Sequence, residues 1–426
     1  MSDQTRRIGR REFLGATAAS AVGLTIVKPE AVRGTAANST VRFGILGVGG
    51  RGTEVGSGFV GAGARVTALA DLFADQLEAG RKHFDALQTK SGGSPIGTDQ
   101  LFRGPDAFKR MAESNEVDFI QISTPPYYHV QHLETVLAAG KHAYCEKPVA
   151  VDVPGAKHVI ELGQKINGKV SLDVGFQIRM APPMLALAQR VWDGAIGPVA
   201  CGEAFYYCPR IDRPARSGAS PDELRLRNWV WYRDLSGDIV VEQNIHVIDM
   251  CNWFLRSHPI AAVATTARKL RADSGDCKDH FNAVLTYPGD VHISFGSTQF
   301  GEPEFDAGVR LFGPDGSSES HYDSRVSIAG KNKWDAGLGG GKPGPQFSAA
   351  GAFRGSLDNA DPEKQKGFLA SITSGQFHNQ AAQGAESALS AMLIRNAAYT
   401  GKSLSWDELL ASTEVYDPKI DLTKLV

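Results

Sequence analysis

The sequence has few cysteines and little sign of metal chemistry built on them. The five cysteines are scattered along 426 residues, and none stands in a C-x-x-C or comparable metal-ligand spacing. They are Cys145, Cys201, Cys208, Cys251 and Cys277. An odd, dispersed set is typical of small buried side chains, although one disulfide among them stays open. We expect neither a zinc cluster nor a disulfide framework.

An excess of charge of one sign is also missing. The formal net charge is −2 with acidic and basic residues interspersed, which argues against the basic face that binds nucleic acid. Beyond the N-terminal region, no stretch supplies the roughly 20 strongly apolar residues of a membrane-spanning helix. Apolar residues still make up 42% of the chain, enough for packed cores. The length suggests two domains.

A pair of arginines followed by a mild apolar run stands near the beginning. The stretch RREFLG begins at Arg10, and the residues after it are rich in alanine, glycine and threonine. This pattern resembles a twin-arginine export signal, whose pathway moves folded proteins across a membrane. We expect residues 1–38 to be a signal peptide and linker, and the protein to be periplasmic or otherwise exported by the twin-arginine machinery. The alternative is a basic, disordered N-terminus that carries two arginines by chance.

A glycine-rich motif follows the first buried-strand pattern. The apolar run 41–46 leads directly into GVGGRG, which matches G-x-G-x-x-G. The first glycine of this motif allows a tight turn, the second lets the backbone approach a pyrophosphate, and the third lets the next helix pack closely. The N-terminus of that helix presents N–H groups to the phosphates. The residues that we expect to bind a dinucleotide here are Gly47, Gly49, Gly50, Arg51 and Gly52.

An acidic residue follows at the spacing that a dinucleotide site requires. The run RVTALA begins at Arg65 and leads to Asp71, some 20 residues beyond the glycines. A carboxylate at this place accepts hydrogen bonds from the ribose 2′-hydroxyl and repels a 2′-phosphate. The sequence therefore favours NAD, with NADP possible. Taken alone, Asp71 is also compatible with an ordinary helix N-cap.

Strand and helix patterns then alternate, which predicts a parallel, doubly wound sheet over residues 39–175. The expected strands are 116–123, 141–145 and 170–174, and the expected helices are 129–140 and 153–164. Ligands of such sheets bind at the carboxyl ends of the strands. Two turns stand at those ends, TPPYYH from Thr124 and CEKP from Cys145.

GVGGRG, TPPYYH and CEKP, in this order and spacing, resemble the Gfo/Idh/MocA oxidoreductases, the family of glucose–fructose oxidoreductase and inositol dehydrogenases. The resemblance covers the chain beyond the leader. It implies that Lys147 of CEKP contacts both the nicotinamide ribose and the substrate. The other residues that it places at the cofactor are Thr124, Pro125, His129 and Glu146. Without the resemblance, Lys147 is compatible with a solvated turn lysine.

The second half, 176–426, loses the regular alternation. A helix pattern over 183–194 and strand patterns over 197–207, 281–287, 291–297 and 309–312 predict an α/β domain with an open, mainly antiparallel sheet. The resemblance implies that the exposed face of this sheet joins subunits into a homodimer or homotetramer. The glycine-rich stretch 330–355 is too irregular for a regular element, and a lid, a subunit arm and a disordered insertion are all open.

The segment SGDIVVEQNIHVIDMCNWFL begins at Ser236 and carries the candidate acid–base residues. Glu242, His246 and Asp249 recur at helical spacing on one stripe. Oxidation of a carbinol requires a base for the hydroxyl proton, and an imidazole exchanges protons near neutral pH. The resemblance implies that His246 is this base and that Glu242 stands where many relatives carry a substrate-orienting aspartate. Glu242 and His246 as a metal-binding i, i+4 pair, or as a solvated helix face, are the alternatives.

A set of arginines and aromatic residues suits a sugar, which is held by stacking and hydrogen bonds. The candidate substrate-binding residues are Arg179, Tyr206, Arg227, Trp231 and Asp249. Each is also compatible with a purely structural place.

These patterns predict an exported NAD(P)-dependent oxidoreductase that acts on a carbinol of a sugar, polyol or glycoside. Because NAD is not freely available outside the cytoplasm, we expect the cofactor to be tightly bound and recycled internally. An NAD-dependent glycoside hydrolase that works through a transient keto-sugar and elimination is the first alternative. A non-catalytic sugar-binding or sensory protein is the second, and the presence of both Lys147 and His246 argues against it.

Overall fold

The computed structural model describes residues 40–211, 216–271, 275–301, 305–322, 325–338 and 357–426. The expected signal peptide and most of the glycine-rich stretch 330–355 lie outside these residues. The region Val41–Val426 forms one compact unit, to which all that follows refers. Within the described residues, no helix is both long enough and apolar enough to cross a membrane.

The first sheet has six strands in the order β3-β2-β1-β4-β5-β6, and all neighbouring pairs are parallel. The strands are β1 (Arg42–Leu46), β2 (Arg65–Asp71), β3 (Leu101–Arg103), β4 (Phe119–Ile122), β5 (His142–Cys145) and β6 (Leu172–Val174). This order is that of a dinucleotide-binding Rossmann domain. The predicted parallel, doubly wound sheet is confirmed, because fully buried strands carry the continuous apolar runs that the sequence shows.

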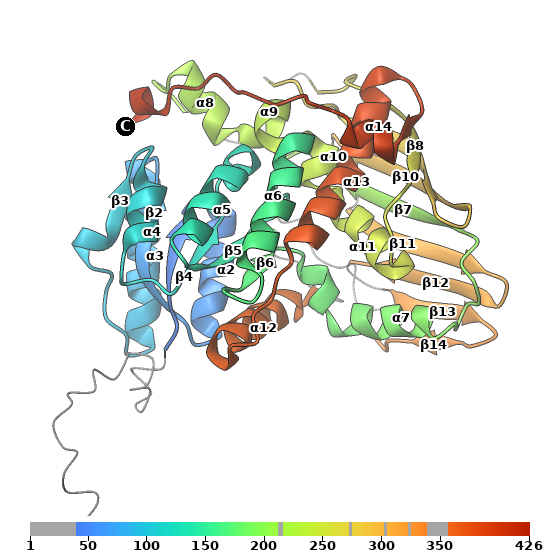
Figure 1. Ribbon diagram of the computed structural model, residues 1–426, viewed down its shortest axis with the longest axis horizontal. Coiled ribbons are helices and arrows are strands. Elements are labelled where there is room, and N and C mark those ends of the chain that lie inside the picture. The colour runs from blue at the N-terminus through green and yellow to red at the C-terminus, as the bar shows by residue number, and fades with distance from the viewer. Residues whose placement is uncertain (1–39, 212–215, 272–274, 302–304, 323–324, 339–356) are drawn as a thin grey trace, which may run out of the picture. The chain divides into compact units, whose positions relative to one another are not determined.

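Helices follow each strand and cover the sheet on both faces (Figure 1). They are α2 (Gly50–Gly61), α3 (Ala74–Lys90), α4 (Ala107–Glu113), α5 (His129–Ala138) and α6 (Val153–Ile166), with the short helices η2 (Thr98–Gln100) and η3 (Pro126–Tyr128). One more helix that covers this sheet comes from much later in the chain. Phe368 of α12 (Ala360–Ser374) packs its ring against Phe59, Phe119 and Tyr144. The core of the first domain therefore includes a helix from the second half of the sequence.

The second sheet has nine strands in the order β14-β13-β12-β11-β7-β10-β9-β8-β15. All its pairs are antiparallel except β10 with β7, so the predicted mainly antiparallel sheet is confirmed. The strands are β7 (Cys201–Cys208), β8 (Ala261–Ala267), β9 (His280–Tyr287), β10 (Val291–Gln299), β11 (Asp306–Gly313), β12 (Gly316–His321), β13 (Val326–Gly330), β14 (Trp334–Asp335) and β15 (Leu404–Ser405).

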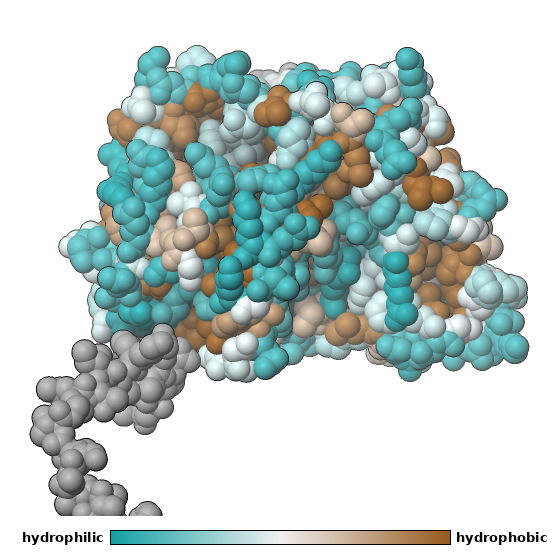
Figure 2. All heavy atoms as spheres, in the orientation of Figure 1, coloured by the Kyte–Doolittle hydropathy of each residue, from teal (hydrophilic) through white to brown (hydrophobic). Residues whose placement is uncertain are grey.

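The remaining helices pack on one face of this sheet or connect it to the first domain (Figure 1). They are η4 (Gln177–Met180), α7 (Pro182–Trp192), α8 (Pro221–Arg227), η5 (Trp229–Trp231), α9 (Arg233–Ser236), α10 (Ile239–Glu242), α11 (Ile245–Leu255), α13 (Ala381–Thr400), α14 (Trp406–Leu410) and η7 (Leu422–Leu425). Large apolar side chains are exposed on the strands, among them Val263, Val284 and Phe312. Figure 2 shows apolar side chains among hydrophilic ones on the side where this sheet lies.

The segment over which we expected helical spacing is divided between two short helices, α10 and α11. Gly237 and Asp238 have positive φ values of 85° and 78°, which end α9 and turn the chain into α10. A second break at Gln243 and Asn244 separates α10 from α11. Glu242 and His246 consequently lie on different short helices. The expected continuous helix is therefore wrong, although Glu242 and His246 still line one pocket, which Asp249 does not.

Candidate active site

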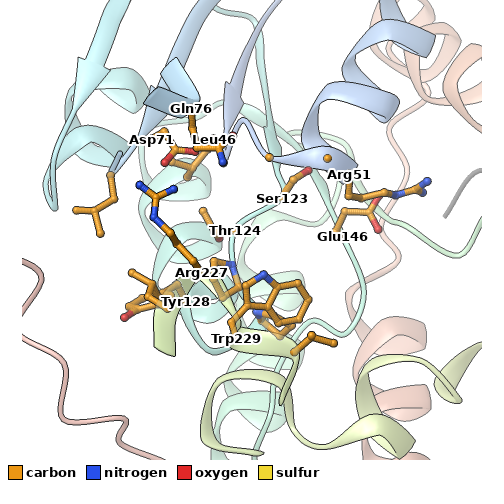
Figure 3. Close-up of a pocket in the computed structure, with 18 of the residues that line it drawn as sticks. Leu46, Arg51, Asp71, Gln76, Ser123, Thr124, Tyr128, Glu146, Arg227 and Trp229 are labelled. Atoms are coloured by element: carbon orange, nitrogen blue, oxygen red, sulfur yellow. The ribbon is translucent and has the colours of Figure 1, made fainter. Parts of the chain in front are cut away.

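A cleft of about 550 Å³ lies at the carboxyl ends of the parallel strands. Its walls come from the loops after β1, β2, β4 and β5 and, from the second half of the chain, from β7, α8, α10 and α11. Figure 3 shows side chains from both halves projecting into it. The cleft thus joins the expected dinucleotide site and the expected catalytic segment.

The glycine loop has the backbone that a pyrophosphate requires. Gly47 has a φ of 87°, and a Cβ there would lie 2.7 Å from the Ser123 carbonyl oxygen. A Cβ on Gly52 would collide with the Gly47 carbonyl, whereas one on Gly49 would meet nothing within 4 Å. Gly47, Gly49 and Gly50 line the cleft, and Gly52 lies behind them against the turn. The open space at Gly49, next to the first turn of α2, fits a phosphate group.

Asp71 ends β2 and lines the cleft. Its carboxylate accepts hydrogen bonds from the backbone N–H groups of Val48 at 2.8 Å and Phe73 at 3.0 Å. Burial raises the pKa of Asp71, and these two hydrogen bonds oppose the shift. The carboxylate is therefore held in one orientation at the place expected for a ribose-binding acid.

Lys147 extends from the end of β5 to the second half of the chain. Its Nζ donates to Glu242 Oε1 at 2.7 Å and to the Glu242 carbonyl oxygen at 2.5 Å. Both side chains line the cleft and are largely buried, with 13% and 11% of their surfaces exposed. A solvated turn lysine is therefore excluded. Because the Lys147 ammonium pairs with the Glu242 carboxylate, Glu242 orients this lysine.

His246 lines the same cleft from α11 and is 6% exposed. Its Nδ1 has no hydrogen-bond partner among the described residues. Burial lowers the pKa of His246 well below its ordinary value, and the positive charges of Lys147 and Arg51 lower it further. A buried, neutral imidazole that lines a cleft is suited to accept a proton from a ligand, because one of its two ring nitrogens is an acceptor.

Arg51 of the glycine loop turns toward two carboxylates. Its Nε donates to Glu146 Oε1 at 2.9 Å, and its Nη2 lies 3.2 Å from Asp361 Oδ1 of α12. Figure 3 shows the Arg51 and Glu146 side chains next to each other. Burial raises the pKa of Glu146, and Arg51 opposes this shift. The pair connects the glycine loop to the turn that carries Lys147.

Of the other predicted cofactor residues, some line the cleft and one does not. Thr124 and Pro125 line the cleft. His129 does not line it, and both of its ring nitrogens are 2.7 Å from backbone carbonyl oxygens, those of Pro148 and Thr124. The ring lies between the two turns that flank the site. Burial lowers the pKa of His129 to about 4, and the two backbone contacts oppose this shift.

Three predicted substrate residues do not reach the cleft. Arg179 pairs with Asp249 through two hydrogen bonds of 2.9 and 2.8 Å, and Ser387 also donates to this carboxylate. Trp231 is buried and donates its indole N–H to the Ile211 carbonyl oxygen at 3.0 Å. These corrections have one cause. Sequence position places a residue near the domain junction, but side-chain partners decide whether it faces the ligand.

The two remaining predicted substrate residues line the cleft at different places. Tyr206 of β7 is buried there. Arg227, at the end of α8, stacks on Phe73 with 3.6 Å between its guanidinium carbon and the ring centroid. It therefore lies beside the loop after Asp71, at the end of the cleft where the adenosine half of a dinucleotide belongs (Figure 3).

Sequence reasoning missed several polar residues of the cleft. Gln177 and Gln243 line it, and Gln177 Oε1 is buried without a partner among the described residues. Gln177 follows the last Rossmann strand and Gln243 is adjacent to Glu242, so their positions next to named candidates were the available signal. Within the part of the chain that the structure describes, no group of three His, Cys, Asp or Glu side chains is arranged to hold a metal ion.

A Rossmann sheet with a glycine loop, a ribose-side acid and a lysine and histidine at one cleft defines a dinucleotide-dependent dehydrogenase. A family profile described as "Oxidoreductase family, NAD-binding Rossmann fold" matches residues 41–174, and one described as "GFO/IDH/MocA C-terminal domain" matches 184–319. The two matches together span more than half of the sequence. The chain belongs to the GFO/IDH/MocA oxidoreductase family and is an NAD-dependent oxidoreductase.

Named relatives differ in activity. An inositol 2-dehydrogenase of Rhizobium meliloti is 26% identical over 292 residues, 68% of this chain and 78% of that protein. A glycosyl hydrolase family 109 protein of Streptomyces coelicolor is 27% identical over 223 residues, 48% of this chain and 46% of that protein. The crystal structure of an aldose-aldose oxidoreductase from Caulobacter crescentus, complexed with glycerol, covers 86% of this chain and 99% of its own at a TM-score of 0.66 and 20% identity. This last likeness shows the fold.

Proposed function

We propose that this protein oxidises a carbinol of a sugar, polyol or glycoside and that it keeps its NAD bound between reactions. The observation that carries the proposal is His246, a buried histidine that lines the same cleft as Lys147 and the glycine loop. The inositol dehydrogenase, aldose oxidoreductase and glycosyl hydrolase names of its relatives support a polyhydroxy substrate.

The residues divide the work of the reaction as follows. The glycine loop and Asp71 hold the dinucleotide, which supplies a hydride acceptor. His246 takes the hydroxyl proton of the substrate, since a neutral imidazole has one acceptor nitrogen. The Lys147 ammonium donates a hydrogen bond to the substrate oxygen, and Glu242 keeps this lysine in place at 2.7 Å. Tyr206 and Gln177 form further walls of the cleft for the substrate.

Retention of the cofactor follows from the proposed export. RREFLG resembles a twin-arginine signal, and an enzyme that works outside the cytoplasm must bring its NAD along. A retained cofactor has to be regenerated in place. One way is to oxidise one sugar and then reduce a second carbonyl compound at the same site.

Redox-assisted glycoside cleavage is the second candidate, favoured by the match to a glycosyl hydrolase family 109 protein. In this scheme a sugar carbinol is first oxidised to a ketone, which acidifies the adjacent C–H bond. A base removes that proton, the glycosidic oxygen leaves with its bonding electrons, and water adds to the unsaturated ketone. The ketone is then reduced back to the carbinol, so that hydrolysis occurs without net oxidation.

The test uses purified full-length protein and no added nucleotide. Extracted small molecules identify the bound nucleotide, and the absorbance of reduced nicotinamide is followed while inositols, aldoses and aryl glycosides are added. Reduction by a free sugar, reversed by a second carbonyl compound, supports the first candidate. Release of an aglycone without net reduction supports the second. A bound sugar that never reduces the nucleotide supports the sugar-binding or sensory alternative and contradicts both.

We further propose that the protein associates with a second copy of this chain. Val263, Val284 and Phe312 expose apolar side chains on the second sheet, a face suited to subunit contact. Light scattering distinguishes a homodimer or homotetramer from a monomer.

A further inference from the structure

Arg227 reaches across the cleft from the second half of the chain to the first. Its Nη2 donates to Asp75 Oδ1 at 2.8 Å and its Nη1 to Asp75 Oδ2 at 3.3 Å. Asp75 is in the first turn of α3, directly after the strand that ends at Asp71. Arg227 Nε donates to Glu223 Oε1 of its own helix at 2.7 Å, which holds the guanidinium on the Phe73 ring. Arg216 adds a second ion pair to Asp75, at 2.8 Å.

The C-terminal segment lies over the same end of the cleft. Figure 1 shows it running from α14 past α9 and α8 toward β3. Arg225 of α8 donates to the Pro418 carbonyl oxygen at 2.6 Å, which fixes the segment to that helix. Leu422 lines the cleft, and a Cβ built on Gly104, after β3, would lie 3.5 Å from Val426.

These contacts enclose one part of the cleft from two sides. One wall consists of Leu72, Phe73 and Gln76, which follow Asp71. The opposite wall consists of Leu226, Arg227 and Leu422. Ion pairs from Arg227 and Arg216 to Asp75 join the two walls.

We propose that Arg227, paired with Asp75, is a latch that retains the adenosine half of the bound dinucleotide, with α8 and residues 416–426 as its cover. The inference rests on the proposed retention of NAD and assigns that retention to named contacts. It places Arg227 with the cofactor, where the sequence suggested the substrate. The latch opens by breaking Arg227–Asp75, and this step sets the rate of cofactor release.

The experiment measures release directly. The holoenzyme is loaded with NADH, excess NAD is added, and the loss of bound-NADH fluorescence gives the dissociation rate. Arg227→Gln and Asp75→Asn each remove the ion pair, and Asp75→Asn does so without changing the side-chain size. We expect each variant to release NADH at least about 10-fold faster, equivalent to about 1.4 kcal/mol. The double variant should be no faster than Asp75→Asn alone, because Asp75→Asn already breaks the Arg227 pair together with the Arg216 pair.

Arg81→Gln is the matched control, because Arg81 forms an exposed ion pair with Asp85 on the same helix and does not line the cleft. Its release rate should equal that of the parent. Release rates of both latch variants within twofold of the parent overturn the latch. If the latch variants release faster but no sugar reduces the bound cofactor, the latch holds and the proposed reaction fails. If sugars reduce the cofactor in a parent that already exchanges NADH freely, the latch fails and the reaction holds.

Discussion

Lys147 and Glu242 come from opposite halves of the chain and form a single unit at the centre of the cleft. Their contact fixes the ammonium that is to meet the substrate oxygen, so Glu242 acts through Lys147. The sequence predicted that both residues belong to the site, Lys147 because of the CEKP motif and Glu242 because of the segment that carries His246. It did not predict that they pair, because a pair 95 positions apart depends on how the two domains pack.

Replacing Glu242 with Gln should separate orientation from chemistry. The amide keeps the size but loses the charge, so we expect KM for the sugar to rise and kcat to fall about 10-fold, as a charge-assisted hydrogen bond of about 1.5–3 kcal/mol is lost. Steady-state kinetics on both parameters check this. A variant with unchanged KM and kcat contradicts a positioning role, and an unchanged amount of bound NAD serves as the folding control.

Asp71 is predicted to select NAD over NADP. Its carboxylate is held by two backbone N–H groups and faces the cleft, so Asp71→Ser should weaken NAD and relieve the repulsion of a 2′-phosphate. Calorimetric titration of cofactor-free protein with each dinucleotide measures the ratio of affinities, which should shift toward NADP about 10-fold or more. Equal weakening of both dinucleotides contradicts the assignment. Asp75→Asn, at the latch, should leave the ratio of the NAD and NADP affinities unchanged and should change only the rate of cofactor release.

At the scale of elements, the turn between α9 and α10 rests on a buried carboxylate. Asp238 accepts hydrogen bonds from Tyr399 Oη at 2.7 Å and from the Ile239 and Lys278 N–H groups. Burial raises the pKa of Asp238 to about 6. The folded protein therefore binds this proton more tightly than the unfolded chain does.

The contribution of Asp238 to the free energy of unfolding decreases as the pH rises. The contribution of protonated Asp238 is fully present below pH about 4 and is lost as the pH rises through about 6. Asp238→Asn does not titrate and tolerates the positive φ. Urea unfolding should show that, between pH 4 and 7, the free energy of unfolding of the variant rises relative to that of the parent by on the order of 3 kcal/mol. A constant difference over this range contradicts the shifted carboxyl.

The sequence predicted five of the six parallel strands, because each of the five is an apolar run that ends at a turn. It did not predict β3, whose three residues are not buried. It did not predict the break at Gln243 and Asn244, since helical spacing alone does not show where a helix is interrupted. It also failed to place α12 on the first sheet. An apolar face such as that around Phe368 shows that a helix packs, but not against which sheet.

At the scale of the whole molecule, export is a prediction from RREFLG. Replacing Arg10 and Arg11 with lysine keeps the charge but removes the pair that the twin-arginine machinery reads. We expect active enzyme with bound NAD to accumulate in the cytoplasm. Fractionation with activity and nucleotide assays checks this, and a double variant that still reaches the periplasm contradicts the signal.

The cover over the adenosine end is also a property of the whole molecule. It depends on Arg227 meeting Asp75, 152 positions earlier in the sequence, and on Arg225 meeting Pro418, 193 positions later. The local patterns of α8 and the C-terminal segment indicate exposed, polar elements and nothing more. Such long-range contacts are set by packing of the two halves, which is why the sequence assigned Arg227 to the substrate.

The most direct test of the central claim is a single turnover of the bound cofactor. Parent protein and His246→Ala, both purified with NAD in place, are mixed with the best sugar, and the absorbance of reduced nicotinamide is followed. Loss of a positioned base should slow this step by about 10²–10⁴-fold, or roughly 3–5 kcal/mol of barrier, while NAD stays bound. Reduction in His246→Ala at the parental rate would contradict the account and make Lys147 the first candidate for the base.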